Sequence, residues 1–385
     1  MAPGVFRREL RVQATPRAVF HQLYRVDPQA LWLDSLGPLG SNTSVLASGE
    51  LLCFPIGQAL SGLRQAWAEL SLSVEGESPP LGLLTVLPYE LAVETMGGNP
   101  TPGAEGGQVE PVRAVKVTRS LEFDHHSGRI TAWSLSESEE AHESWCRELE
   151  QTLVGSPDTQ ESAQVGAGRA MSWRDDPERY REMISLALDA IRDGEVYQIC
   201  LTTQVAVSSD ILDWQLHEIL RKSNPSPHQG LIRLGDYTMV SSSPETFLRL
   251  GRSGEVITRP IKGTRPRGES QEDDLRLLTE LRESDKEQAE NLMIVDLMRN
   301  DLLRVCEAGS IQVSGLFDVE TYSSVHQLVS TVSGKLRAGQ DGIDLIAACF
   351  PAGSMTGAPK HRAVELLRRW ESGPRGLYSG AWGWL

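Results

Sequence analysis

The chain has 385 residues, of which 40% are hydrophobic and 23% are charged, and this composition is typical of a soluble globular protein with one large or two ordinary domains. Its formal net charge of -15 argues against non-specific binding to nucleic acids or anionic membranes, because such binding needs a basic face. The five cysteines show no metal-binding spacing, and the sequence contains neither a signal-peptide pattern nor an apolar run of membrane-span length. We therefore expect a cytoplasmic protein with buried free thiols.

The first region, residues 1–170, has the pattern of short strands separated by turns. An apolar strand is predicted over residues 31–35, and a hairpin is predicted around the turn at residues 124–128. The remaining expected elements of this region are a strand at 5–12, a short helix at 16–23, a mobile loop at 97–109, an amphipathic helix at 137–153 and a polar linker at 155–169. The linker suggests a boundary between this region and a second region, residues 171–385.

The second region has more regular signals. Asp176 followed by Pro177 is typical of a helix N-terminus, and apolar residues then recur at helical spacing up to Ile191. A strand is expected at 196–207, a helix at 211–223 and four successive antiparallel strands between residues 229 and 258.

Residues 272–303 predict two helices that meet near Ser284, where Ser284 and Glu287 form a capping box. Glu287 and Glu290 lie one helical turn apart on the second of these helices. Two carboxylates in this arrangement can bind a hard cation with water completing the shell. The alternative is that both are solvated surface acids.

Two segments have the composition of anion-binding sites. Residues 259–267 contain four cations, two prolines and a glycine, which predicts a rigid basic loop suited to a small anion with more than one carboxylate. Residues 351–360 form a glycine-rich turn before a cationic helix, and the free N–H groups of such a turn can bind a carboxylate or phosphate. The pair His125 and His126 could bind a metal, although adjacent histidines in a turn are usually only solvated. These patterns indicate an α/β enzyme, but they do not identify its substrate.

Six motifs resemble, in order and spacing, those of the chorismate-utilising enzymes, a family that includes anthranilate, aminodeoxychorismate, isochorismate and salicylate synthases. The motifs occupy residues 243–245, 259–267, 285–291, 294–302, 325–328 and 350–360. The resemblance is dense from about residue 175 to the end and weak before it. It implies an α/β (α+β) fold with two packed antiparallel sheets and helices outside.

Two positions distinguish the members of this family. Gln198 stands where the isochorismate and salicylate synthases carry a lysine base, and Lys262 stands where anthranilate synthases have a small residue and aminodeoxychorismate synthases have lysine. The resemblance therefore implies that the chain acts as an aminodeoxychorismate synthase component I, with a glutamine amidotransferase subunit supplying ammonia. The alternatives are an anthranilate synthase component I and a non-catalytic relative or inactive fragment.

The same resemblance implies roles for individual residues. Lys262 is the expected nucleophile, with its ammonium form disfavoured by Arg259 and Arg265, and Glu245 is the expected general acid and base. The implied cofactor is Mg²⁺. The further implied site residues are the metal ligands Glu290 and Glu287, the substrate-binding residues His326, Thr356, Gly357, Tyr378 and Thr264, and a possible tryptophan pocket at Leu33 and Ser35. Lys360 is expected to be either a substrate contact or a cation near the loop.

Family members continue past the segment 378–381 through an arginine strand, a carboxylate loop and a helix with a second magnesium glutamate. The present sequence ends at Leu385. We therefore expect the catalytic region to be truncated at its C-terminus.

Overall fold

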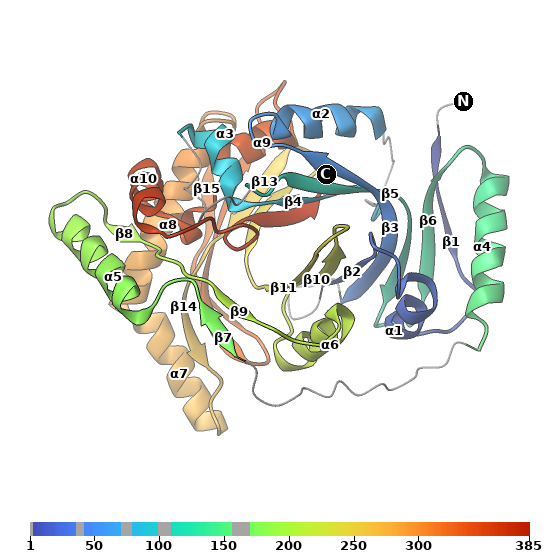
Figure 1. Cartoon of the computed structure of the whole chain (residues 1–385), viewed down its shortest axis with the longest axis horizontal. Helices are drawn as coiled ribbons and strands as arrows, with labels where there is room; N and C mark the ends of the chain where they lie inside the picture. Colours follow the sequence, from blue (N-terminus) through green and yellow to red (C-terminus); the bar gives the residue numbers. More distant parts are fainter. Residues whose placement is uncertain (1–2, 36–41, 71–78, 99–108, 156–169) are drawn as a thin grey trace.

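Two large antiparallel sheets organise the structure, a computed structural model that describes residues 3–35, 42–70, 79–98, 109–155 and 170–385 (Figure 1). The larger sheet has nine strands, and seven of them follow the order β1-β6-β5-β3-β2-β10-β11. Strand β4 pairs with both β5 and β18. The bounds of these strands are β1 Gly4–Glu9, β2 Leu31–Ser35, β3 Thr43–Phe54, β4 Gly82–Leu87, β5 Val112–Asp124, β6 Ile130–Ser136, β10 His228–Arg233, β11 Thr238–Ser243 and β18 Ala381–Trp384.

The smaller sheet is built around β16, which pairs with β13 and β14 and also with β15. Its five strands are β12 Thr246–Leu250, β13 Glu255–Arg259, β14 Ile261–Pro266, β15 Gln312–Thr321 and β16 Val325–Lys335. Two short ribbons complete the strands: β7 (Met171–Trp173) pairs with β9 (Val205–Val207), and β8 (Gln198–Ile199) pairs with β17 (Gly357–Ala358).

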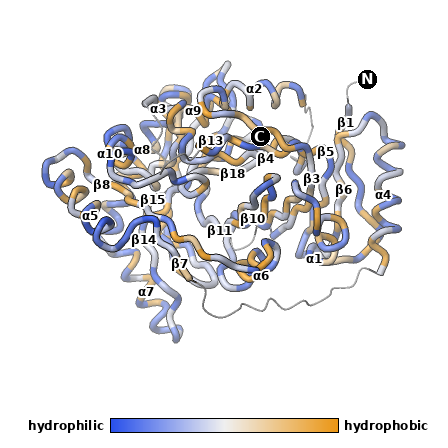
Figure 2. Tube along the Cα trace, in the orientation of Figure 1, coloured by the Kyte–Doolittle hydropathy of each residue, from blue (hydrophilic) through white to orange (hydrophobic). Residues whose placement is uncertain are grey.

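Helices lie outside the sheets, as Figure 1 shows for α4 beside β1 and β6 and for α7 and α8 beside the smaller sheet. In Figure 2, α4 and α7 mix hydrophilic and hydrophobic residues, as expected for helices with one face on the protein. The helices are α1 Pro16–Val19, α2 Ala59–Leu70, α3 Ala92–Met96, α4 Glu139–Leu153, α5 Pro177–Arg192, α6 Asp213–Ser223, α7 Gln271–Glu283, α8 Asp285–Leu303, α9 Gly342–Cys349 and α10 Lys360–Trp370, with a π-helix at Phe20–Tyr24 and 3₁₀ turns at Tyr89–Leu91 and Gly353–Met355.

The core follows from the alternation of side chains along the strands. In β2, Trp32 packs with Phe20 and Trp214 on one face, whereas Leu31 and Leu33 belong to a cluster on the opposite face. A third cluster combines α2, β4 and α9 with Phe247 of β12, and so joins the two sheets. The fourth cluster fills the space between the smaller sheet and the helices α8 and α9. The predicted fold of two antiparallel sheets with helices outside is confirmed.

Most elements with strong local signals are confirmed. These include the strand at Leu31–Ser35, the β5–β6 hairpin and the helices α4, α5 and α6. The two helices meeting near Ser284 are also confirmed, and the Ser284 hydroxyl accepts the Glu287 N–H at 3.4 Å.

Two expected elements differ in the structure. The basic segment is not a loop, because residues 261–266 form β14 and pair with β16. The pairing shifts register between Ile261 and Thr264, where Gly263 adopts a φ of 93° that favours glycine. The strand expected at residues 196–207 is reduced to β8 and β9, with an irregular segment between them. In both cases a partner distant in sequence decides the conformation.

The boundary near residue 170 stays a prediction, and the nine-stranded sheet combines strands from both sides of it. The loop expected at 97–109 and the linker expected at 155–169 lie largely outside the described residues. Within the described ranges, no helix combines the length and apolar character needed to cross a bilayer. All five cysteines are free thiols, as expected, but only Cys146, Cys306 and Cys349 are buried, whereas Cys53 is exposed.

Candidate active site

Three elements bring Glu245, Lys262 and Ser354 together. Glu245 lies on the connection between β11 and β12, where the chain passes from the larger to the smaller sheet. Lys262 lies on β14, and Ser354 lies on the 3₁₀ turn that follows α9. The Ser354 hydroxyl donates to Oε1 of Glu245 at 2.6 Å, and Nζ of Lys262 donates to the Ser354 carbonyl oxygen at 2.9 Å. The two predicted catalytic residues therefore share one hydrogen-bonding partner.

The environment of Glu245 changes its acidity. Burial raises the pKa of the Glu245 carboxyl to about 7, although the Ser354 hydroxyl, the Lys262 charge and the Ile261 N–H each act to lower it. A carboxyl group with this pKa exchanges protons readily near neutral pH, which is what general acid and base catalysis requires.

The turn that carries Ser354 packs tightly against α8. A Cβ atom on Gly353 would lie 2.6 Å from Cδ2 of Leu297, so a side chain at this position would have to displace that methyl group. Behind the turn, the Lys360 ammonium donates to the carbonyls of Cys349 at 2.8 Å and Pro351 at 2.7 Å, and it pairs with Asp301. Lys360 is only 9% exposed and has three acceptors, which matches its three N–H donors. These contacts favour a structural role for Lys360, as a cation that holds the loop, over a role as a substrate contact.

The arginines of the basic segment are all paired with carboxylates. Arg259 pairs with Glu320, and Arg267 pairs with Asp274 at 2.7 Å. Arg265 contacts two acids, which are Glu280 at 2.9 Å and Glu287 at 3.3 Å. These carboxylates compensate the charges of Arg259 and Arg265, the two arginines that were expected to act on Lys262.

The two predicted metal ligands lie on the first turns of α8. Glu287 packs against β14, with its Oε2 atom 3.1 Å from the position of a Cβ on Gly263, and Glu290 lies 3.8 Å from the Lys286 ammonium. No cluster of three or more potential protein ligands for a metal occurs among the described residues. The two carboxylates fit Mg²⁺, because this ion is commonly held by one or two carboxylates, with water and substrate oxygens as its other ligands.

The predicted substrate-binding residues fall into two groups. His326, Thr356 and Gly357 are buried. The His326 ring contacts Thr321 Oγ1 and Asp274 Oδ1, both at 2.9 Å, and the Thr356 hydroxyl donates within its own turn. Thr264 and Tyr378 are exposed, Tyr378 by 62%. Their contact with substrate stays a prediction.

The possible tryptophan pocket lies on β2. Leu33 is buried in the cluster that includes Trp382, and Ser35 is half-buried at the strand end. Between them, Asp34 turns to the opposite face, where its carboxylate contacts His217 at 3.1 Å and Arg221 at 2.7 Å. Binding of tryptophan at this strand stays a prediction.

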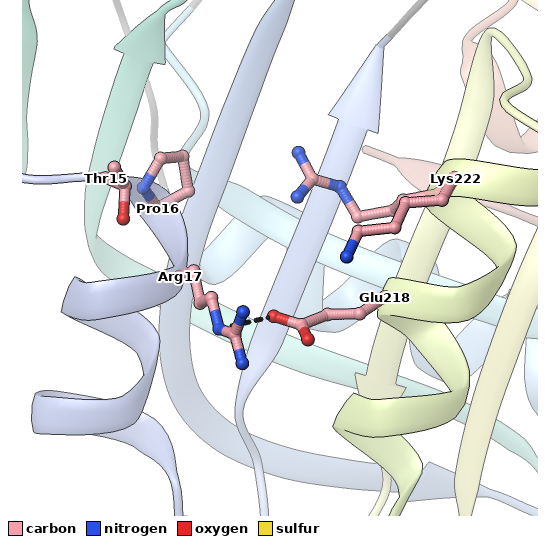
Figure 3. Close-up of a pocket in the computed structure, with 6 residues that line it drawn as sticks. Thr15, Pro16, Arg17, Glu218 and Lys222 are labelled. Atoms are coloured by element: carbon pink, nitrogen blue, oxygen red, sulfur yellow. Dashed lines mark ion pairs between the residues drawn. The ribbon is translucent and has the colours of Figure 1, made fainter. Parts of the chain in front are cut away.

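A surface pocket of about 220 Å³ adjoins this charge network (Figure 3). In the figure, Arg17 of α1 and Glu218 of α6 point toward one another across the pocket, where they form an ion pair at 2.9 Å. The lining residues are Thr15, Pro16, Arg17, Glu218, Arg221 and Lys222. None of the predicted site residues lines this pocket, so it is separate from the group around Ser354.

Two features of the site could not be predicted from the sequence. Ser354 lies inside one of the six motifs, but its residue type does not predict that it contacts both of the predicted catalytic residues. Arg375 and Glu371 form a buried ion pair at 2.7 Å, and Arg375 also donates to the carbonyls of Met355 and Cys200, both at 2.7 Å. The spacing of Glu371 and Arg375 fits a helical pair, yet the helix ends before them, so only the tertiary structure reveals this contact.

Comparisons with known proteins identify the relatives of this chain. The family model described as chorismate binding enzyme matches residues 43–385. Two proteins named aminodeoxychorismate synthase are similar: that of Streptomyces pristinaespiralis is 39% identical over 79% of this chain, and that of Streptomyces griseus is 35% identical over 99%. The chain spans only 43% and 57% of their lengths, or about half.

Anthranilate synthases are also similar. Component 1 from Thermus thermophilus is 42% identical over 65% of this chain, which spans 53% of that protein. Among solved structures, anthranilate synthase component I from Streptococcus pneumoniae superposes with a TM-score of 0.76 at 24% identity, covering 97% of this chain and 87% of that one. This structural likeness supports the fold.

Proposed function

Because the chain belongs to the family of chorismate binding enzymes, whose model matches residues 43–385, we propose that it converts chorismate and ammonia to 4-amino-4-deoxychorismate. The observation that carries this proposal is the placement of Lys262 and Glu245 on one shared partner, Ser354. Lysine at position 262 favours amination at C4 over the anthranilate reaction, because the anthranilate synthases have a small residue there. The similarity to two aminodeoxychorismate synthases supports the same assignment.

In the proposed reaction, the neutral amine of Lys262 forms a bond to C2 of chorismate while the ring double bonds shift and the C4 hydroxyl leaves. Glu245 gives its proton to that hydroxyl, which departs as water. Ammonia then forms a bond to C4, the double bonds shift back, and the bond between C2 and Lys262 breaks. The Glu245 carboxylate takes up the proton that the incoming ammonia loses. The enolpyruvyl ether is retained throughout.

We assign Glu290 and Glu287 as the protein ligands of Mg²⁺. When bound, the ion neutralises the ring carboxylate of chorismate. We also propose that a glutamine amidotransferase subunit supplies the ammonia, as the family resemblance implies. We propose a cytoplasmic location for this reaction.

The Lys262→Ala variant tests the proposal. The purified protein is supplied with chorismate, Mg²⁺ and ammonium, and the products are identified by mass spectrometry. We expect 4-amino-4-deoxychorismate from the unaltered protein and at least about 100-fold less from the variant, because the nucleophile is lost. Lys222→Ala, which removes an exposed lysine of α6, is the matched control and should leave the product unchanged. Formation of anthranilate by the unaltered protein would instead assign it to the anthranilate synthases.

A further inference from the structure

Ser354 contacts both groups on which the proposed chemistry depends. Its hydroxyl donates to Glu245 at 2.6 Å, its carbonyl accepts from Lys262 at 2.9 Å, and the residue is only 4% exposed. We propose that Ser354 is a positioning residue that holds Lys262 and Glu245 in one hydrogen-bonded unit and governs how the two share a proton. This inference rests on the proposed function, since it gives Ser354 a role in the same reaction.

The side chain of Ser354 acts on the carboxyl group. A hydroxyl that donates to a carboxylate stabilises the ionised form relative to the protonated form. Around Glu245, burial favours the protonated form, whereas the Ser354 hydroxyl, the Lys262 charge and the Ile261 N–H favour the ionised form. Ser354 therefore limits how far burial can raise the pKa of Glu245.

The main chain of Ser354 acts on the lysine. A carbonyl oxygen can accept an N–H from either the ammonium or the neutral amine of Lys262, so the contact survives deprotonation. The neutral amine donates one N–H to this carbonyl and keeps its lone pair for the attack on C2. Transfer of one proton from Nζ of Lys262 to a carboxylate oxygen of Glu245 produces both species that the reaction needs, which are a neutral nucleophile and a protonated acid. The charge of the pair does not change in this step.

Two carboxylates on the helices beside β14 are already paired with an arginine. On α7 and α8, which pack against β14, Glu280 and Glu287 contact Arg265. The charge that acts on Glu245 comes from Lys262. The protonation of Glu245 therefore depends on its burial, on the Ser354 hydroxyl, on the Lys262 charge and on the Ile261 N–H.

The turn that carries Ser354 is held on both sides. Gly353 packs against Leu297, Lys360 binds the carbonyl of Pro351, and Arg375 binds the carbonyl of Met355. Because these contacts fix the backbone, removing the Ser354 hydroxyl should leave its carbonyl in place for Lys262. A substitution at this position therefore tests the side-chain contact alone.

The test compares Ser354→Ala with Ser354→Thr, which keeps a hydroxyl. Glutamate labelled with ¹³C at its side-chain carboxyl is incorporated, the Glu245 signal is assigned by its loss in Glu245→Gln, and its chemical shift is followed against pH. We expect Ser354→Ala to move the titration midpoint of Glu245 upward by about one pH unit, because a hydrogen bond to the charged form is lost. Ser354→Thr should restore the midpoint of the unaltered protein. If Ser354→Ala does not fold, Ser354→Cys, whose thiol donates weakly, should give a smaller upward shift.

An unchanged midpoint in a folded Ser354→Ala or Ser354→Cys variant overturns the inference. The pH dependence of product formation gives a second measurement. The pH at which activity falls on the alkaline side should rise together with the titration midpoint of Glu245. The titration requires no turnover, so the two proposals can fail separately. Absence of 4-amino-4-deoxychorismate from the unaltered protein counts against the proposed function, whereas an unmoved Glu245 midpoint counts against the role of Ser354.

Discussion

The carboxyl group of Glu245 lies where the chain crosses from one sheet to the other, and its acidity follows from that position. Burial raises its pKa from the ordinary 4.5 to about 7. Between these two values the unfolded chain has released the proton while the folded protein still holds it. The free energy of unfolding contributed by this group therefore decreases as the pH rises from about 4.5 to about 7.

The Glu245→Gln variant should reveal this pH-dependent loss of stability, because glutamine does not titrate. We expect the free energy of unfolding of the variant, relative to the unaltered protein, to increase between pH 5 and pH 8 by roughly 1 to 3 kcal/mol and to level off above pH 7. Urea unfolding at several pH values measures the difference. Glu283→Gln, at an exposed position of α7, is the control for the loss of one negative charge at the surface. Parallel pH profiles for Glu245→Gln and the unaltered protein would show that the carboxyl is not perturbed.

Among the elements, the turn between α9 and α10 is held by a buried cation as well as by apolar packing. Lys360 satisfies the carbonyls of Cys349 and Pro351 and is paired with Asp301 on α8. Removing one member of a buried ion pair leaves the other charge without compensation, which costs more than loss of a surface pair.

The Lys360→Met variant should lose about 3 to 5 kcal/mol of stability, because Asp301 and two buried carbonyls lose their partner. Lys335→Met is the matched control: this lysine is 58% exposed and lies 3.7 Å from Glu307, so its loss should cost less than about 1 kcal/mol. Equilibrium unfolding in denaturant measures both values. In the double variant Lys360→Met with Asp301→Leu, part of the lost stability should return. Equal losses for Lys360→Met and Lys335→Met would mean that the buried pair does not hold the turn.

Helices and strands whose ends are marked by a short local pattern could be predicted from the sequence. Ser284 with Glu287 marks the start of α8, and Asp176 with Pro177 marks the start of α5. The basic segment was expected to be a loop because its prolines and glycine are turn residues. Its strand conformation depends on pairing with β16, which follows much later in the chain. Local patterns could not reveal that partner.

The candidate site, too, could be predicted from the sequence only in part. Lys262 and Glu245 were predicted through the family motifs, and the structure brings them to one partner. The contact of Lys262 is a main-chain carbonyl, which every residue type carries, so the sequence could not identify Ser354. Lys360 lies in a motif as well, but only its burial distinguishes a structural cation from a substrate contact.

At the scale of the whole molecule, the order of strands in the large sheet ties the two regions of the sequence together. Strand β10 pairs with β2, with Gly230 opposite Leu33, and β18 pairs with β4, with Ala381 opposite Leu87. Arg375 adds a polar link, because its guanidinium lies 4.3 Å from the ring centre of Tyr89 while it binds carbonyls of the second region. Strands and apolar side chains of each region are therefore covered by strands and side chains of the other region.

This interleaving predicts that neither residues 1–170 nor residues 171–385 fold when produced alone. Without β2 and β4, the second region leaves β18 without a partner and one edge of β10 unpaired, and it exposes Leu231 and Trp382, so it should aggregate. Co-expression of the two fragments should restore a soluble complex, and the intact chain should unfold in one thermal transition followed by circular dichroism. A soluble 171–385 fragment with its own cooperative transition would contradict this view and would establish the second region as an independent folding unit.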